Sequence, residues 1–129
     1  MKKIIMLRGK DYSGKTTTLN LVYDELVNNR KAKVCSYVKL GWKGDDFACT
    51  LDYNNQKVAI FSMGDYVDDI RRAIDYYAHK SVDVLVIANR NKSQVDHFST
   101  QTITKNKIRS ALKQNADNMS CMMQIINAI

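Results

Sequence analysis

The chain has 129 residues, of which 45% are apolar and 26% are charged, and its formal net charge is +7. These values are typical of one globular domain with a modest core, so we expect a single domain over residues 1–129. No apolar run approaches the length of about 20 residues that spans a bilayer. A short apolar run near the N-terminus superficially resembles a signal sequence, but Arg8 ends it where a cleavage region should be. We therefore expect a cytoplasmic protein without a membrane partner.

The excess of basic residues has two explanations. Part of it can serve an anion site, and the rest could attract nucleic acid. The lysines and arginines are scattered and are not interleaved with aromatic residues, which favours ordinary solvated surface charge, and we expect Arg71 and Arg72 in particular to be exposed. A nucleic-acid partner thus stays open but is not favoured. The cysteines and histidines show no metal-binding spacing, so we expect small buried cysteines in a reducing compartment.

Apolar and polar residues alternate in a way that predicts strands and helices in turn. The first half predicts a strand, a helix, a second strand and a hairpin of two strands, at about 3–7, 14–29, 33–38, 47–53 and 57–62. Asn54 and Asn55 form the expected hairpin turn. The second half predicts a helix, a strongly apolar strand, a polar stretch, a helix and a final apolar segment, at about 66–79, 82–88, 89–102, 105–115 and 119–126.

The sequence also predicts how the last two segments begin and fold. Thr104 is a plausible N-cap for the helix over 105–115. The final apolar segment over 119–126 is expected to be an edge strand, with a helix as the alternative. Strands that alternate with helices indicate an α/β fold in which a mostly parallel sheet is covered on both faces, here with one antiparallel hairpin strand. Ligands bind such sheets beyond the carboxyl ends of the strands, so the residues that follow each strand are the candidates for function.

The first strand is followed by the most informative motif of the chain. Residues Gly9-Lys10-Asp11-Tyr12-Ser13-Gly14-Lys15-Thr16 spell G-x-x-x-x-G-K-T, the phosphate-binding loop or Walker A motif, between a predicted strand and a predicted helix. A chance match of the four fixed positions is expected in roughly one chain in a few hundred of this length. The motif predicts a nucleotide-binding set made of Gly9, Lys10, Asp11, Tyr12, Ser13, Gly14, Lys15, Thr16 and Thr17.

Each fixed position of the motif has a chemical reason. Glycine at positions 9 and 14 lets the backbone turn tightly and approach a ligand. The loop then aims amide groups at an anion, at the positive end of the following helix. Lys15 adds a charge for the β- and γ-phosphates, and the Thr16 hydroxyl is suited to Mg²⁺.

The strand over 57–62 leads to a second candidate, Asp65. An apolar strand that ends in an acid is the Walker B arrangement, which places a carboxylate across from Thr16 to hold Mg²⁺. Asp65 lies a few residues beyond the strand, which suits a general base or an acceptor contact instead, and Asp is also a favoured helix N-cap. Ser62 is the second candidate at this strand end.

The strand over 82–88 leads to Asn89-Arg90-Asn91-Lys92. GTPases place N-K-x-D at such a point, and this segment departs from that motif, so guanine specificity is not supported. Arg90 is similar to the arginine at the start of the lid in small P-loop kinases, where it stacks on a base or neutralises charge on the transferring phosphoryl group. A solvated loop arginine is the alternative. The polar residues 91–102 fit either a lid or a plain loop.

Together, Gly9–Thr16, Ser62–Asp65 and the strand that precedes Arg90 resemble the P-loop containing nucleoside triphosphate hydrolase superfamily, and within it the compact nucleotide-kinase-like branch. The resemblance implies a three-layer sandwich with a sheet of about five strands, in which the Walker A strand is central and the Asp65 strand lies beside it. It also implies ATP and Mg²⁺ as ligands. The chain departs from nucleotide kinases in being shorter, in lacking an arginine-rich lid, and in carrying a hairpin over 47–62 where a helical substrate-binding segment is usual.

Two functions are consistent with these residues. The first is a small ATP-dependent kinase with Lys15, Asp65 and Arg90 as catalytic residues, in which Lys15 and Mg²⁺ neutralise the phosphates and Asp65 orients or deprotonates an acceptor. The metal ligands would be Thr16 and Asp65. The second is a slow ATPase that acts as a nucleotide-dependent switch and binds a protein or nucleic-acid partner. Trp42 suits either function, as a stacking platform or a partner contact, although packing on its own domain is the more ordinary fate of a tryptophan.

Overall fold

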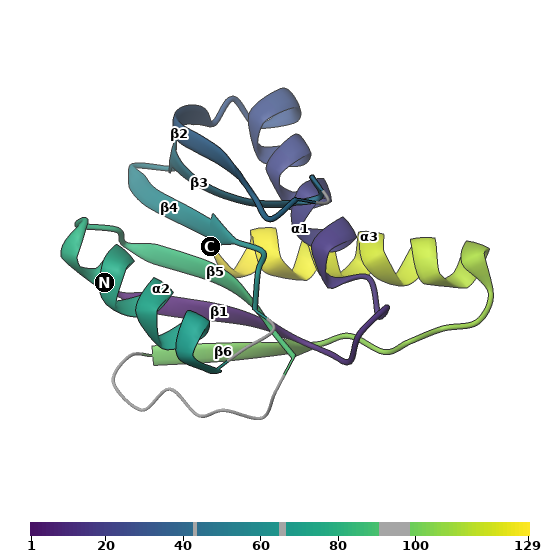
Figure 1. Cartoon of the computed structure of the whole chain (residues 1–129). Coiled ribbons are helices and arrows are strands. Elements are labelled where there is room, and N and C mark those ends of the chain that lie inside the picture. The colour runs from purple at the N-terminus through teal and green to yellow at the C-terminus, as the bar shows by residue number, and fades with distance from the viewer. Residues whose placement is uncertain (43, 65–66, 91–98) are drawn as a thin grey trace.

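The computed structural model describes residues 1–42, 44–64, 67–90 and 99–129. Their secondary structure alternates between strands and helices, in agreement with the sequence pattern (Figure 1). The elements in chain order are β1 (Lys3–Arg8), α1 (Lys15–Asp24), the π-helical turn η1 (Glu25–Asn29), β2 (Lys33–Leu40), β3 (Asp46–Tyr53), β4 (Gln56–Phe61), α2 (Val67–His79), β5 (Val84–Asn89), β6 (Ser99–Thr104) and α3 (Ala111–Ala128). Within these ranges, no helix combines the length and the apolar character that a membrane crossing requires.

The strands form one mixed sheet of six strands in the order β2-β3-β4-β5-β1-β6. Strands β4, β5, β1 and β6 are parallel to one another, whereas β3 is antiparallel to both β2 and β4. The α/β class is therefore confirmed, with six strands in place of about five. The expectation that the strand before Asp65 lies beside the Walker A strand is wrong, because β5 lies between β4 and β1. Strand β5 is buried at all of its positions, and a strand that is apolar on both faces is most stable at the centre of a sheet.

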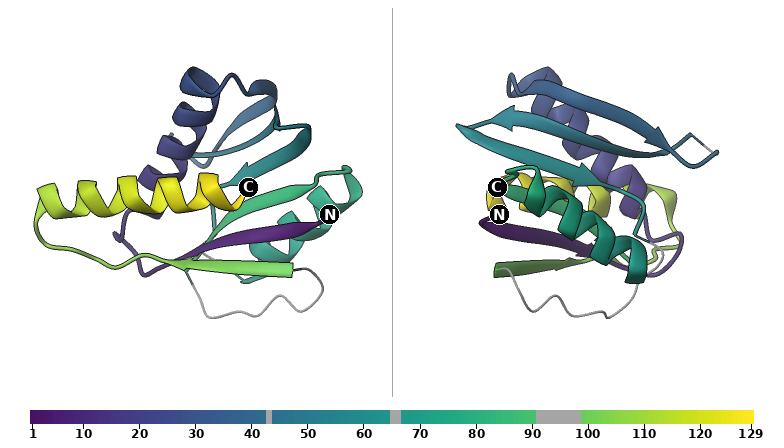
Figure 2. Two further views of the ribbon diagram at one scale, coloured as in Figure 1. Left: turned by 180° about the vertical axis from the view of Figure 1, so that it is seen from behind. Right: turned by 60° about the vertical axis from the view of Figure 1, so that its left-hand side comes forward.

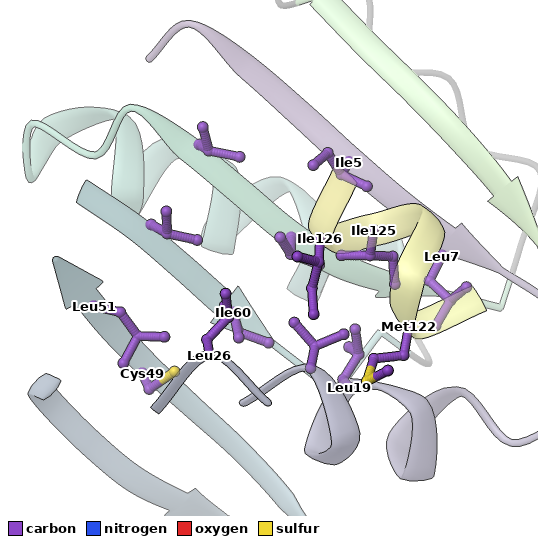
Figure 3. Close-up of a cluster of buried hydrophobic side chains, with 14 of the residues drawn as sticks. Ile5, Leu7, Leu19, Leu26, Cys49, Leu51, Ile60, Met122, Ile125 and Ile126 are labelled. Atoms are coloured by element: carbon purple, nitrogen blue, oxygen red, sulfur yellow. The ribbon is translucent and has the colours of Figure 1, made fainter. Parts of the chain in front are cut away.

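Helices cover the two faces unequally (Figure 2). Alternate residues of β1 point to opposite faces, as the period of a strand requires: Ile5 and Leu7 join the core under α1 and α3, whereas Ile4 and Met6 join the core under α2. The larger core brings Leu19 of α1 against the C-terminal half of α3 (Figure 3). The described residues thus form three layers, with two helices on one face of the sheet and one on the other.

The hairpin of β3 and β4 agrees with the sequence prediction. Asn54 and Asn55 both have positive φ angles, 56° and 60°, which is the geometry of the two-residue type I′ turn that suits the twist of paired strands. The pairing of Ala48 with Phe61 fixes the register. Because the two strands are antiparallel, the beginning of β3 lies at the same edge of the sheet as the end of β4.

The C-terminal part of the chain differs from the prediction. Residues 119–126 belong to helix α3 and are not an edge strand, because apolar pairs four residues apart, Cys121-Met122 and Ile125-Ile126, form one buried helical face. The helix predicted over 105–115 begins only at Ala111, and its N-cap is Ser110, whose hydroxyl accepts a hydrogen bond from the Lys113 amide at 3.4 Å. Thr104 is instead the last residue of β6, a strand that the sequence analysis missed.

Candidate functional site

The loop between β1 and α1, residues Gly9–Thr16, lies at the carboxyl end of the central strands. Tyr12 and Gly14 have left-handed backbones, with φ angles of 59° and 91°, on either side of Ser13. Neighbouring residues of opposite hand curl the backbone into a concave nest of amide groups, and the first amides of α1, which lack acceptors within the helix, continue it. This backbone is suited to an anion.

Both glycines of the loop are required by their surroundings. A Cβ atom on Gly14 would lie 2.5 Å from Oδ1 of Asn118, and one on Gly9 would lie 2.6 Å from Oγ of Ser13. Alanine has no room at either position, and the left-handed backbone of Gly14 adds strain for any other residue.

The side chain of Lys15 reaches back across the loop. Its Nζ donates hydrogen bonds to the carbonyl oxygens of Gly9 at 2.6 Å and Lys10 at 2.9 Å, and the residue is only 9% exposed. Burying an ammonium is costly unless acceptors surround it, and the two carbonyl groups supply them. The result is a positive charge held at the nest, in a position to exchange carbonyl acceptors for an anion.

A cavity of about 480 Å³ opens in front of the loop. Its lining comes from the loop and the start of α1 on one side and from the hairpin on the other: Asp11, Tyr12, Gly14, Lys15, Thr16, Thr17, Asp45, Asp46 and Ser62. Six of the nine residues predicted to bind nucleotide therefore line one cavity. The other three, Gly9, Lys10 and Ser13, shape the backbone behind it.

The hairpin contributes a carboxylate that the sequence analysis did not select, Asp46. Its Oδ1 accepts hydrogen bonds from the Thr16 hydroxyl at 3.2 Å and from the Ser62 hydroxyl at 2.8 Å. The Ser62 oxygen in turn accepts from the amide of Phe47 at 2.8 Å, which ties the two strand ends together. Two hydroxyl groups and one carboxylate thus meet at the mouth of the cavity.

A signal for Asp46 exists in the sequence. The hairpin was predicted, and in a hairpin the first residues of one strand lie beside the last residues of the next. Asp46 immediately precedes the predicted start of the first hairpin strand, and Ser62 ends the second. In a parallel sheet the residues that follow the strands meet at one edge, whereas an antiparallel strand brings its first residues to that same edge.

Behind the loop, α3 and the end of β6 supply a buried polar network. The ammonium of Lys105 is fully buried and bonds to Asp117 at 2.6 Å and to Oδ1 of Asn118. That oxygen also receives the Thr18 hydroxyl at 3.4 Å, and Gln114 donates to the carbonyl oxygen of Ser13 at 3.0 Å. A satisfied network of this kind rigidifies its surroundings, so it fixes the back of the loop.

Arg90 does not line the cavity but contacts one of its lining residues, Asp11. Its guanidinium forms an ion pair with Asp11 of the loop at 3.1 Å, and both side chains are about half exposed, at 47% and 46%. The Arg90 amide donates to the carbonyl oxygen of Gly64 at 3.0 Å. Gly64 is packed so closely on Ala88 that a Cβ atom would lie 1.6 Å from its carbonyl oxygen. The segments that follow β4 and β5 therefore hold each other beside the loop.

The remaining predicted site residue, Asp65, lies outside the described residues, so its role stays a prediction. Trp42 lies in the β2–β3 connection and is 90% exposed, and Tyr12 is 87% exposed with the Lys107 ammonium 5.8 Å from its ring centre. The Trp42 side chain is thus mostly exposed rather than buried in its own domain.

The cysteines differ from one another. Cys49 and Cys121 are buried as expected, and burial raises the pKa of the Cys49 thiol to about 12. Cys35 is exposed on β2, contrary to expectation. Among the residues that the structure describes, no group of three or more histidine, cysteine or acidic side chains could hold a metal ion. A cation at this site would therefore depend on hydroxyl groups, one or two carboxylates and the ligand's own oxygens.

Comparisons with protein-family models, with curated proteins and with solved structures find no match for this chain.

Proposed function

We propose that the loop of residues Gly9–Thr16 binds the triphosphate of ATP together with Mg²⁺, and that the protein is a small nucleotide-kinase-like phosphotransferase. The observation that carries the proposal is the position of the Lys15 ammonium, held against a nest of backbone amides and facing a cavity of about 480 Å³. A buried cation, the positive end of a helix and a concave backbone together favour a polyanion.

The residues around the cavity fit a magnesium ion as well as phosphate. Mg²⁺ usually keeps several waters and is bound through one or two carboxylates plus substrate phosphates. The Thr16 hydroxyl and the Asp46 carboxylate, 3.2 Å apart, are the groups that would hold it. When bound, the ion neutralises charge on the phosphate oxygens. We accordingly assign the carboxylate role to Asp46 and keep Asp65 as a candidate for contact with an acceptor.

Arg90 is suited to charge that develops during transfer. Its ion pair with Asp11 is half exposed, and such surface pairs contribute only about 0.2–1 kcal/mol. The guanidinium can therefore leave Asp11 for a phosphoryl group at little cost. This arrangement supports a role for Arg90 in transfer rather than in ground-state binding.

The test is the substitution Lys15→Ala, with Lys113→Ala as a matched control on the exposed surface of α3. Calorimetry should detect magnesium-dependent ATP binding in the wild type and the control, and no binding in Lys15→Ala, while circular dichroism shows an unchanged fold. Equal affinity in all three proteins would remove the proposal.

One observation also supports the alternative function, in which the protein is a slow ATPase that switches a partner-binding surface. Thr16 contacts Asp46, and the connection just before Asp46 carries the exposed Trp42, so a change at the phosphate site has a short route to a partner surface. Incubation with labelled ATP and a panel of nucleosides and nucleotides separates the two functions. Transfer of label indicates a kinase, whereas slow phosphate release alone indicates the switch.

A further inference from the structure

One face of the sheet is only partly covered. Helix α2 packs on β1, β4 and β5 through residues such as Ile70, Ala73 and Ile74. Helices α1 and α3 lie on the opposite face. Within the described ranges, no helix lies over β2 and β3 on the α2 side, and the right-hand view of Figure 2 shows these strands extending beyond α2. The cause is the β3–β4 hairpin, which joins its strands through two residues and supplies no crossover helix.

The uncovered surface has the dimensions of one helix. Helix α2 is centred over β5, and β3 lies two strands away, which is about 9.6 Å at the usual strand spacing. Packed helices lie about 8–10 Å apart, so a helix over β3 would sit beside α2 at normal packing distance. Strand β3 has 8 residues, a length of about 26 Å that matches a helix of about 17 residues. A groove of about 680 Å³ already occupies this position.

The floor of the groove is apolar over most of its lining, with the hydroxyl groups of Ser36 and Thr50 at one end, and its wall is basic. Val38 and Leu40 of β2, Ala48 of β3 and Phe61 of β4 line the floor, and Val38 is 55% exposed. The wall is formed by Arg72 and Tyr76 on one face of α2 and by Lys80 just after the helix, whose ammonium lies 5.3 Å from the centre of the Tyr76 ring.

The charges around the groove are predominantly positive. Its lining includes three cations, Lys57, Arg72 and Lys80, and one acid, Asp69. Lys57 already pairs with Asp52 at 3.3 Å, whereas the described residues offer no ion pair to Arg72 or Lys80. An occupant with acidic side chains along its edges would complement this wall.

We propose that this groove docks an acidic amphipathic helix from a partner protein, in the position that a crossover helix would otherwise fill. The apolar face of the partner helix would cover Val38, Leu40, Ala48 and Phe61, and its acidic edge would meet α2. A second copy of this chain is less suited, because the acidic residue of α3, Asp117, already pairs with Lys105 at 2.6 Å and leaves that helix without a free acidic edge. The proposal goes beyond nucleotide binding and does not require it.

The probe is a fluorescein-labelled synthetic peptide of about 17 residues, with leucines at helical spacing and glutamates along both edges of the apolar face. Its binding is measured by fluorescence anisotropy. We expect Arg72→Glu to weaken binding by about tenfold or more, because a like charge then faces the glutamates. The matched control is Arg71→Glu, since Arg71 neighbours Arg72 on α2, is also exposed and lies outside the groove. It should change the affinity less than threefold.

Two further measurements make the test specific. Ala48→Glu should abolish peptide binding, because its side chain fills the floor of the groove and adds a negative charge there, and circular dichroism should confirm that this variant is folded. In the wild type, the changes in amide NMR shifts that the peptide causes should concentrate on β2, β3 and α2. The Lys15→Ala protein should bind the peptide with wild-type affinity. Peptide binding is therefore independent of nucleotide binding, and the docking proposal can be tested even if the nucleotide proposal fails.

Four results would overturn the proposal. They are equal effects of Arg71→Glu and Arg72→Glu, equal binding of a scrambled peptide of the same composition, shifts centred outside the groove, and displacement of the peptide by a second occupant. For the last result, one competitor for the groove is a single-stranded oligonucleotide. The other is a second copy of the protein, whose occupation of the groove would be detected as self-association that Val38→Glu abolishes.

Discussion

The carboxylate of Asp46 can be tested with a substitution that separates charge from hydrogen bonding. Asparagine has the same shape and keeps one side-chain oxygen, so Asp46→Asn can still accept from Thr16 and Ser62, whose hydroxyl groups lie 3.2 and 2.8 Å away. We therefore expect the free energy of unfolding to fall by less than about 1 kcal/mol. Asp46→Ala removes both acceptor contacts beside the buried Ser62 and should cost about 1–3 kcal/mol.

Asp46→Asn should affect ligand binding much more strongly than it affects the stability of the protein. If the Asp46 carboxylate holds Mg²⁺ directly or through water, Asp46→Asn should weaken magnesium-dependent ATP binding by about 10–100-fold, the range seen when a supporting ligand group is lost. Binding of ATP without the metal should change little or improve, because a negative charge has been removed from the cavity. The assay is calorimetry over a series of Mg²⁺ concentrations.

The control for this experiment is Asp52→Asn, at the opposite end of the same strand, where the carboxylate is exposed and pairs with Lys57. It removes the same charge from the same strand without touching the cavity. An Asp46→Asn protein with the wild-type dependence on Mg²⁺ would refute the metal role and leave Asp46 as a structural link between the hairpin and α1.

Three further substitutions test the surroundings of the loop. Gly14→Ala should lower the free energy of unfolding by about 1–3 kcal/mol in urea titrations, because the new methyl group would lie 2.5 Å from a side-chain oxygen of α3; unchanged stability would mean that the loop is not held this tightly. Lys105→Met should cost about 1–3 kcal/mol, since Asp117 loses a partner at 2.6 Å, and a stabilised protein would contradict this account. Arg90→Ala should leave ATP affinity within about threefold but reduce the transfer rate by at least about tenfold, and a loss confined to affinity would assign Arg90 to binding.

The elements that the sequence predicted well are those whose burial follows from their own pattern. Strand β5 is buried throughout, is apolar up to its last residue and lies inside the sheet, and the hairpin is specified by alternation and by two turn residues that tolerate positive φ angles. Strand β6 is different, because among the described residues it pairs with β1 alone, and it exposes Thr100 and Gln101. An edge strand that buries so little carries no apolar pattern to detect.

Helix α3 shows the converse difficulty. Its buried residues near the C-terminus occur as two adjacent apolar pairs, which a short window cannot assign to a helix or to a strand buried on both faces. The helical choice is made by tertiary packing, since Met122, Ile125 and Ile126 meet Leu19 of α1 over the sheet (Figure 3). The order of the strands is likewise a property of packing between distant segments, so the insertion of β5 between β1 and β4 left no local signal.

The antiparallel direction of β3 accounts for two features that the sequence did not predict, the position of Asp46 beside Thr16 and the open groove on the α2 side of the sheet. A parallel β3 would require a crossover of a dozen or more residues before β4, which would cover the α2 side of the sheet and move Asp46 to the opposite edge. The antiparallel strand instead brings Asp46 to Thr16 and leaves Ala48, two residues or about 6.6 Å along the strand, in the open groove. The candidate metal ligand and the candidate docking surface are therefore parts of one rigid strand, and a helix docked on that strand would lie within a short distance of the cavity.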